Sequence, residues 1–322
     1  MATALPLSKS VHLPSPTRIG WIGIGVMGAP MCEHLLQANF PLTIHSRTKV
    51  KAERLLQQEA QWVNTTTDVI AEADVVCTMV GFPNDVRHIY LGNDGLVAKS
   101  RPGQVFVDFT TSDPDLAVEI AECAQERQVF ALDAPVSGGD VGAKQGTLSI
   151  MVGGNVSVFE ALLPILRTFG KVLVHHGPAG CGQHAKLCNQ VTIAGTMIGV
   201  CEALLYAHQA GLNGEKLLES IRQGAAGCWT LDHLAPKMLQ QDFSPGFFVE
   251  HFIKDMGLTL VSANRMGLLL PGLSMVHKLY QAVQAQGHGR SGTQALLVAL
   301  ECMAPIHLST SSNPSSSSPS VR

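Results

Sequence analysis

The sequence predicts a two-domain α/β protein in which a doubly wound, mainly parallel sheet is followed by an all-α C-terminal domain. Three observations predict this fold. Short apolar runs alternate with helical patterns from Arg18 to about His176, the apolar runs stop before Gly182, and only helical patterns follow. Alternating strands and helices are typical of a parallel sheet with helices on both faces. We therefore expect a flexible tail at 1–17, a sheet domain at 18–182, a helical domain at 183–308 and a disordered Ser/Pro-rich tail at 309–322.

The strands of the first domain are predicted from short runs rich in β-branched residues. These runs are Ile19–Ile24, Leu42–His45, Val75–Val80, Val105–Phe109, Val129–Leu132, Leu148–Val152 and Val172–His175. One helix between them carries a clear start signal, because Ser112 and Asp113 precede Pro114 at a first-turn position. The helices of the second domain are expected at Gln183–Ala210, Gly214–Gln223, Trp229–Gln240, Val249–Arg265, Gly272–Gln286 and Gly292–Cys302, with breaks at Gly and Pro residues.

The composition argues against several classes of protein. Hydrophobic residues make up 46% of the 322 positions and charged residues 15%, with a mean hydropathy of +0.19, which suits two buried cores and not disorder. The formal net charge is -3 and no run of Lys or Arg occurs, so we expect no nucleic-acid partner. The eight cysteines form no C-x-x-C pair and the histidines show no zinc-site spacing. We expect reduced thiols and no metal.

The longest apolar stretch, Val191–Leu212, contains Gly195 and Gly199 at the spacing of paired membrane helices. Glu202 interrupts this stretch and no cluster of positive charge flanks it, so we expect a buried helix and no membrane partner. Residues 1–17 lack acids but are short and weakly charged. We therefore expect a cytoplasmic protein, with a mitochondrial or plastid transit segment as the alternative.

A glycine-rich loop reading G-I-G-V-M-G lies between the first predicted strand and a helical pattern. Gly23 suits the tight turn, Gly25 lets a pyrophosphate approach the backbone, and Gly28 lets the helix pack closely on the strand. The phosphates would lie at the N-terminus of that helix. We predict a Rossmann-type dinucleotide site with contacts from Gly23, Gly25, Val26, Met27 and Gly28, in preference to a plain structural turn.

The end of the second predicted strand bears on the choice of cofactor. An NAD site usually has Asp or Glu about twenty residues beyond the glycines, to bind the ribose diol. At that distance this chain has Arg47, and no acid occurs between Glu33 and Glu53. Arg47 is flanked by the hydroxyl residues Ser46 and Thr48, and its guanidinium is suited to a 2′-phosphate. We predict NADP as the preferred cofactor, with NAD possible.

Two further segments carry polar side chains suited to a substrate. The segment D-A-P-V-S-G-G, which starts at Asp133, follows a strand with a glycine-rich turn, where Ser137 and backbone N–H groups are able to hold a carboxylate. At the start of the long helix, Lys186, Asn189 and Gln190 stand at i, i+3 and i+4 and so share one face. This polar face lies in an apolar helix, where we expect the two domains to meet.

With these segments in this order, the chain from about Arg18 to Met303 resembles the β-hydroxyacid dehydrogenase family. That family includes 3-hydroxyisobutyrate dehydrogenase, tartronate semialdehyde reductase and the glyoxylate/succinic semialdehyde reductases, and the chain is most similar to its plant-type 3-hydroxyisobutyrate dehydrogenase-like members. The resemblance implies an NAD(P)-dependent oxidoreductase acting on the CH–OH group of small hydroxy acids. It also implies a second domain like the C-terminal domain of 6-phosphogluconate dehydrogenase, and a homodimer or homotetramer.

The resemblance also implies roles for individual residues at the substrate. Lys186 matches the family's catalytic lysine, and Asn189 matches the amide that supports the lysine and the substrate. Ser137, Gly138 and Gly139 match the loop that holds the substrate carboxylate.

Other positions match family contacts to the cofactor. Thr111 matches a threonine after its strand, Val80 and Gly81 match the turn beside the adenosine and nicotinamide halves, and Lys254 matches a lysine that closes over the cofactor. The chain departs from many members at Gly81, where they have proline, and at Gln190, where they have asparagine.

The chemistry of these residues fits the implied function. Reduction of an aldehyde needs a hydride donor, a proton donor at the carbonyl oxygen and a group that holds the carboxylate. Lys186 suits proton transfer in both directions, because desolvation in a closed cleft favours the neutral amine. Ser137 and its glycines suit the third task, since they would fix the reacting carbon against the nicotinamide.

Three other functions are weighed against this one. A non-catalytic NADP(H)-binding scaffold or sensor would be expected to lack Lys186, and an imine reductase typically carries Asp or Tyr in its place. The enzyme 6-phosphogluconate dehydrogenase has a much longer helical domain. Glyoxylate, succinic semialdehyde, methylmalonate semialdehyde and tartronate semialdehyde all stay open as substrates, since they differ by only a few atoms.

Overall fold

The computed structural model describes residues 13–303 and residue 308. The described residues fold into two compact units: residues 13–190 with Gly257–Leu269, and residues 191–256 with 270–303 and residue 308. The division falls inside a helix, after Gln190, whereas the strands end at Gly177. The predicted tails at 1–12 and 309–322 lie outside the described residues. Leu13, placed in a tail by the sequence, packs against the core of the first unit.

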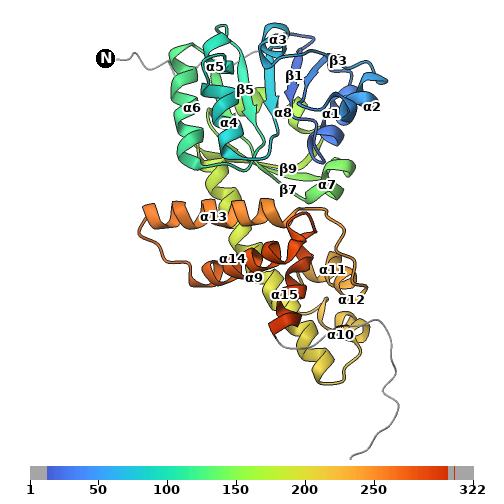
Figure 1. Ribbon diagram of the computed structural model, residues 1–322. Coiled ribbons are helices and arrows are strands. Elements are labelled where there is room, and N and C mark those ends of the chain that lie inside the picture. Colours follow the sequence, from blue (N-terminus) through green and yellow to red (C-terminus); the bar gives the residue numbers. More distant parts are fainter. Residues whose placement is uncertain (1–12, 304–307, 309–322) are drawn as a thin grey trace, which may run out of the picture. The chain divides into compact units, whose positions relative to one another are not determined.

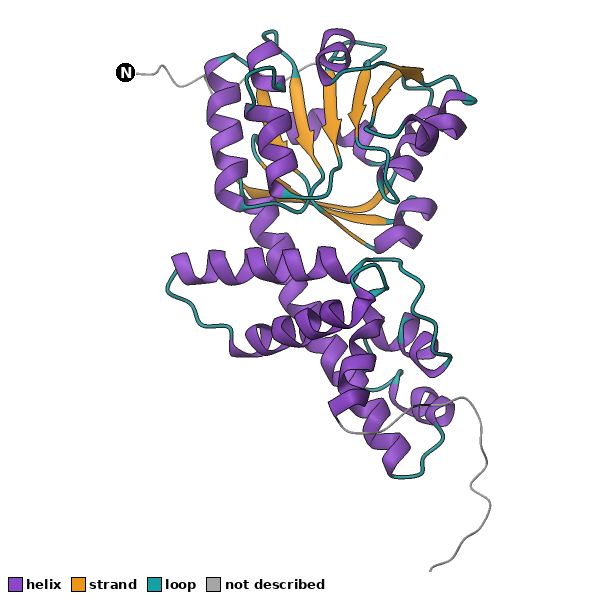
Figure 2. Ribbon diagram, viewed as in Figure 1, coloured by secondary structure: helices purple, strands orange, loops and turns teal. Residues whose placement is uncertain are grey.

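The first unit is built on a nine-stranded sheet (Figure 2). Six parallel strands form its centre in the order β3-β2-β1-β4-β5-β6, which is the doubly wound order of dinucleotide-binding sheets. The strands are β1 (Ile19–Ile22), β2 (Leu42–His45), β3 (Gln61–Trp62), β4 (Val75–Thr78), β5 (Val105–Asp108), β6 (Phe130–Asp133), β7 (Val136–Ser137), β8 (Leu148–Gly153) and β9 (Gly170–Gly177). The predicted mainly parallel sheet is confirmed.

The last three strands extend this sheet beyond β6. β8 pairs antiparallel with β6 at Asp133 and Gly153 and antiparallel with β7, while β9 runs parallel to β8. The sequence did not predict β3 and β7, because two residues are too few for a strand period to be visible.

Helices cover both faces of the sheet, because the strands alternate between two hydrophobic clusters (Figure 1). In β4, Val75 and Cys77 lie in one cluster and Val76 lies in the other. Residues of α1, α2, α7 and α8 fill the first cluster, and residues of α3, α4, α5 and α6 fill the second. The helical segments are α1 (Gly28–Gln37), η1 (Lys49–Ala52), α2 (Glu53–Leu56), α3 (Thr66–Glu72), α4 (Pro83–Leu91), α5 (Leu96–Lys99), α6 (Pro114–Glu126), α7 (Gly139–Gln145) and α8 (Val156–Leu166).

Helix α6 begins where the sequence predicts. The side chain of Asp113 caps it by accepting a hydrogen bond from the N–H of Asp115, with Pro114 in the first turn. The guanidinium of Arg265 lies 2.9 Å from the Asp113 carboxylate. Arg265 belongs to the segment Gly257–Leu269, which is part of the first unit together with the sheet.

The second unit is helical, as predicted. Its helical segments, two of them shared with the first unit, are α9 (Cys181–Gln209), α10 (Gly214–Ile221), α11 (Trp229–His233), α12 (Ala235–Leu239), α13 (Val249–Arg265), α14 (Pro271–Val283), η2 (Gln284–His288), η3 (Thr293–Ala295) and α15 (Leu296–Met303). The helix expected at Trp229–Gln240 is two helices, because Pro236 has no N–H to continue the hydrogen bonding of the first helix and lies in the first turn of the second.

The 29-residue helix α9 is long and apolar enough to cross a membrane by length and composition. Its first turns, however, contain the buried polar residues Gln183, Lys186 and Gln190. Its N-terminus is also hydrogen-bonded to Asp133 at the end of β6. These are the surroundings of a helix inside a folded domain.

Candidate functional site

The glycine loop after β1 has two crowded glycines and one open one. Gly23 has a φ of +105°, and a Cβ there would lie 2.1 Å from the carbonyl oxygen of Met79. A Cβ on Gly28, the first residue of α1, would lie 2.2 Å from the carbonyl oxygen of Gly23. A Cβ on Gly25 would meet no atom within 4 Å. The backbone at Gly25 is therefore open to a ligand at the N-terminus of a helix, an arrangement that fits a pyrophosphate.

The end of β2 presents Arg47 to solvent, with 86% of its side chain exposed. Its guanidinium lies 3.8 Å from the carboxylate of Asp85 in α4, while Ser46 and Thr48 are at least partly exposed. The sequence did not single out Asp85, because nothing local relates α4 to the end of β2. An incoming phosphate would share the Arg47 guanidinium with this carboxylate.

The loops after β4 and β5 are joined by hydrogen bonds. The N–H of Val80 donates to the Thr110 hydroxyl at 3.0 Å, and the Thr110 N–H donates to the Asp108 carboxylate at 3.1 Å. Thr110 is buried, whereas its neighbour Thr111 is partly exposed. The predicted cofactor positions Val80, Gly81 and Thr111 thus lie on neighbouring loops at the carboxyl edge of the sheet, where ligands of such sheets bind.

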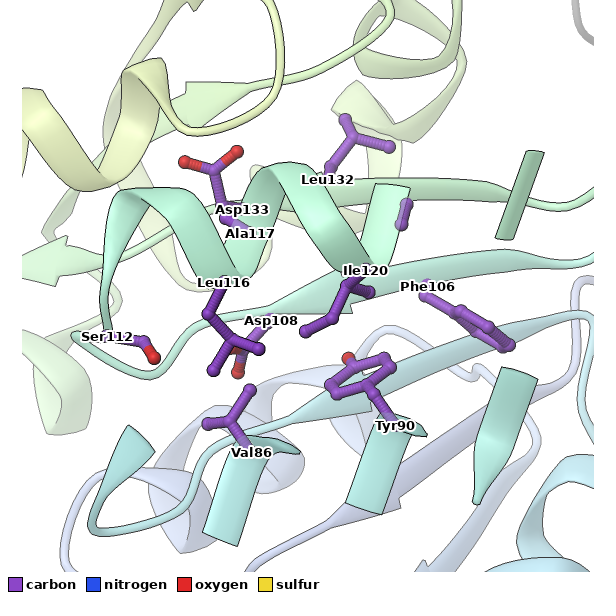
Figure 3. Close-up of a pocket in the computed structure, with 11 residues that line it drawn as sticks. Val86, Tyr90, Phe106, Asp108, Ser112, Leu116, Ala117, Ile120, Leu132 and Asp133 are labelled. Atoms are coloured by element: carbon purple, nitrogen blue, oxygen red, sulfur yellow. The ribbon is translucent and has the colours of Figure 1, made fainter. Parts of the chain in front are cut away.

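A small cavity lies beside these loops, and Figure 3 shows Asp108 and Ser112 among its mainly apolar lining. About 10 Å³ is open to the centre of a water molecule, which suits one water and excludes a nicotinamide or a hydroxy acid. The Ser112 hydroxyl is buried without a hydrogen-bond partner among the described residues. Burial raises the pKa of Asp108 to about 6, although hydrogen bonds from Thr78 and Thr110 act in the opposite direction.

The predicted substrate residues come together at the start of α9. The Ser137 hydroxyl donates to the Asn189 side-chain oxygen at 3.1 Å, and the Asn189 amide donates to Gln190 at 2.8 Å. Lys186, three residues before Asn189, is buried with 7% of its surface exposed. Gln190 therefore orients Asn189, a function that the sequence left open. The loop glycines have φ values of +129° at Gly138 and +62° at Gly139, which favour glycine.

Asp133 and Gln183, which were not assigned roles from the sequence, fix the start of α9. The Asp133 carboxylate accepts the Gly180 N–H at 2.8 Å and the Gln183 N–H at 2.7 Å. Burial raises the pKa of Asp133, and these N–H groups act against that rise by stabilising the charged form. Gln183 and Asp133 are 50 residues apart, so no local sequence pattern relates them.

Lys254, the remaining predicted cofactor residue, belongs to the second unit. Its ammonium lies 3.0 Å from the buried carboxylate of Asp255. Its predicted role over the cofactor stays a prediction. Within residues 13–303 and 308, no three His, Cys, Asp or Glu side chains gather as metal ligands.

Known families match both parts of the chain. Residues 18–177 match the NAD-binding domain of 6-phosphogluconate dehydrogenase, and residues 180–300 match the NAD-binding domain of NADP-dependent 3-hydroxyisobutyrate dehydrogenase. An uncharacterized oxidoreductase of Bacillus subtilis, YkwC, is 52% identical over 86% of this chain and 96% of its own length. A probable mitochondrial 3-hydroxyisobutyrate dehydrogenase-like protein of Arabidopsis thaliana is 49% identical over 92% of this chain and 88% of its own.

A solved structure of 3-hydroxyisobutyrate dehydrogenase from Mycobacterium tuberculosis with L-serine has the same fold. It is 32% identical to this chain, with a TM-score of 0.80, and the match covers 88% of this chain and 99% of that one.

Proposed function

Because the chain belongs to the β-hydroxyacid dehydrogenase family, which includes the 3-hydroxyisobutyrate dehydrogenases, we propose that Lys186 is the acid and base of its hydride transfer. The chain is an NAD(P)-dependent oxidoreductase of this family. In the proposed reaction, a short aldehyde acid and its hydroxy acid are interconverted, with the substrate carboxylate held at Ser137, Gly138 and Gly139.

One observation supports this proposal above the others. Lys186 is buried one helical turn from Asn189, whose amide is hydrogen-bonded to Ser137 of the carboxylate loop. Lysine is almost never buried without a specific partner or function. A buried amine beside a hydroxyl and an amide suits proton transfer at a substrate that is held by its carboxylate. A scaffold protein without catalysis would have no use for this arrangement.

The residues of the chain divide the work of the reaction. A reduced nicotinamide supplies the hydride when it is bound. Lys186 donates a proton to the carbonyl oxygen during reduction and removes it from the hydroxyl during oxidation. The substrate carboxylate competes with Asn189 for the Ser137 hydroxyl proton, and the backbone N–H groups of the loop add further donors. Fixing the carboxylate also fixes the reacting carbon, because only a few bonds separate the two groups in a short acid.

For the cofactor, we propose NADP in preference to NAD. The exposed Arg47 guanidinium supports this choice, because it is available to a 2′-phosphate and no carboxylate on β2 is available to a ribose diol.

For the substrate, we propose a short acid with one carboxylate and an aldehyde or hydroxyl carbon within about three bonds of the carboxylate carbon. The names of the relatives support 3-hydroxyisobutyrate and L-serine as first compounds to test in the oxidation direction. Glyoxylate and the succinic, methylmalonate and tartronate semialdehydes are the compounds to test for reduction.

We also propose a homodimer or homotetramer, supported by exposed apolar side chains such as Tyr206, Met266 and Leu269. We propose the cytoplasm as its compartment, although the Arabidopsis relative carries a mitochondrial label. Light scattering and imaging of the tagged full-length chain test these two proposals.

The function is tested by following reduced nicotinamide while these acids are supplied with NADPH or NADH. Lys186→Ala should lower kcat by about 10²–10⁴-fold and keep dinucleotide binding. Lys171→Ala, which removes an exposed lysine from β9, is the matched control and should keep normal turnover. Near-normal turnover in the Lys186 variant would rule out the proposed role of this amine.

A further inference from the structure

Gln183 joins the helix that carries Lys186 to the loop after β5. Its side chain is fully buried, with 0% exposed. Its amide oxygen accepts the Ser112 N–H at 2.9 Å, and its amide nitrogen donates to the Thr110 carbonyl oxygen at 2.8 Å. Both ends of the amide are therefore satisfied by the backbone of a single loop.

The loop held by Gln183 is part of the cofactor edge of the sheet. The Thr110 hydroxyl accepts the N–H of Val80 in the neighbouring loop at 3.0 Å. That neighbouring loop also contacts the glycine turn, because a Cβ on Gly23 would meet the Met79 carbonyl oxygen. A continuous set of contacts thus runs from the dinucleotide turn to the amide of Gln183.

Further contacts hold the start of α9 close to the sheet. The Gln183 N–H and the Gly180 N–H both bind Asp133 at the end of β6. A Cβ on Gly182 would lie 2.4 Å from the Met151 carbonyl oxygen and 2.6 Å from the Asp133 carbonyl oxygen. Lys186 follows Gln183 by three residues on the same helix, so a shift of the first turn would carry the lysine with it.

We propose that Gln183 is a positioning residue that holds Lys186 in register with the nicotinamide loops. This inference rests on the proposed role of Lys186. A displacement of about 1 Å at a reacting group is able to lower turnover about a hundredfold. The Gln183 amide prevents such a displacement, because it fixes the distance between α9 and the loop through two opposed hydrogen bonds.

The substitution Gln183→Glu tests this role through pH. An ionised glutamate still accepts the Ser112 N–H, but its second oxygen faces the Thr110 carbonyl oxygen and repels it. A protonated glutamate donates a hydrogen bond to that carbonyl and restores the native pattern. Burial favours the protonated form, so the native pattern should return as the pH falls towards the weakly acidic range.

The measurement is kcat from pH 5 to pH 8.5, with NADPH and the aldehyde acid that the wild-type enzyme reduces fastest. We expect Gln183→Glu to be at least about tenfold slower than wild type at the basic end and to approach wild type at the acidic end. Gln183→Met, which removes both hydrogen bonds at every pH, should be slow throughout. It also provides a readout if the glutamate variant does not fold at basic pH.

The opposite end of the same strand offers a matched control. Gln104, just before β5, is buried, and its side-chain amide is also hydrogen-bonded to the backbone at both ends. The amide nitrogen donates to the Ile70 and Ala73 carbonyl oxygens at 2.8 Å, and the amide oxygen accepts the Arg101 N–H. Gln104→Glu repeats the chemical change away from the cofactor edge. It should lower the melting temperature by a similar amount and keep the wild-type pH profile of kcat.

The outcomes separate this inference from the proposed function. A wild-type pH profile for Gln183→Glu together with normal kcat for Gln183→Met would overturn the positioning role. The positioning role would also be overturned if kcat of Gln104→Glu were low at basic pH and returned to the wild-type value at acidic pH, as expected for Gln183→Glu. If one of these results is obtained while Lys186→Ala is inactive in the same assay, the positioning role of Gln183 is lost and the proposed function stands. If Lys186→Ala keeps turnover, the proposed function itself fails.

Discussion

Replacing Gly25 with alanine should separate dinucleotide binding from folding. The added methyl group meets no atom within 4 Å, and the backbone there is outside the left-handed region that favours glycine. An alanine that fits without strain reduces the entropy of the unfolded chain and commonly adds about 0.4–1 kcal/mol of stability. We therefore expect Gly25→Ala to unfold at the same urea concentration as wild type or at a slightly higher one.

Dinucleotide binding should respond in the opposite direction. The methyl group would occupy the surface where a pyrophosphate approaches the backbone. Losing one charge-assisted hydrogen bond there costs about 1.5–3 kcal/mol, which corresponds to roughly 10- to 100-fold weaker binding. Calorimetric titration with NADP and urea unfolding of the same sample measure the two effects.

Gly28→Ala is the comparison, because its Cβ would lie 2.2 Å from the Gly23 carbonyl oxygen. Crowding of this kind destabilises a fold by about 1–3 kcal/mol or more. Wild-type affinity for NADP in Gly25→Ala would refute the assignment of this loop to the pyrophosphate. Equal destabilisation of the two variants would refute the distinction between the open and the crowded glycine.

Three further changes test other parts of the site. Arg47→Ala should raise the KM for NADP about tenfold and leave the KM for NAD unchanged. Asp85→Asn should lower the KM for NADP, because it removes the carboxylate that competes for the Arg47 guanidinium. Equal changes in KM for both cofactors would contradict a role of Arg47 at the 2′-phosphate. Asp108→Asn should raise the free energy of unfolding at pH 8 by about 3 kcal/mol at most relative to wild type, and this difference should shrink towards pH 4. The sign follows because burial raises the Asp108 pKa from 3.8 to about 6. The wild-type protein therefore loses stability as the pH rises from about 4 to about 6, whereas the asparagine variant has no carboxyl group to ionise. Urea unfolding across this range would contradict this reasoning if the difference in unfolding free energy between the two proteins were constant. Gly182→Ala should lower kcat and stability together, because its Cβ would meet two backbone oxygens at the start of α9, and steady-state rates with a melting curve would exclude this if both stayed normal.

The fold is predictable from the sequence wherever a pattern is long enough to have a period. The runs that form β4 and β5 are apolar and β-branched, and they appear as strands within two residues of their predicted bounds. β3 and β7 have two residues each and carry no period. The helix expected at Trp229–Gln240 is interrupted, because Pro236 has no N–H to continue the hydrogen bonding of the first helix.

The site is predictable where its residues are neighbours along the chain. Lys186 and Asn189 share a helical face, and the glycine loop is a contiguous motif. The positions that hold these groups in place depend on tertiary contacts. Asp133 meets the start of α9 only when β6 and α9 are folded together, and Asp85 meets Arg47 only when α4 lies beside the end of β2. Their partners are set by the fold, so no local motif reveals them.

The central claim is that a dinucleotide bound at the glycine loop exchanges hydride with a short acid at Lys186. The most direct measurement is the transfer of deuterium from the reactive position of labelled NADPH to the product, followed by mass spectrometry. We expect the wild-type enzyme to place one deuterium on the carbinol carbon of the hydroxy acid, and the Lys186→Ala variant to form almost no labelled product while still binding NADPH. Unlabelled hydroxy acid from the wild type, or equal labelling by the variant, would contradict this claim.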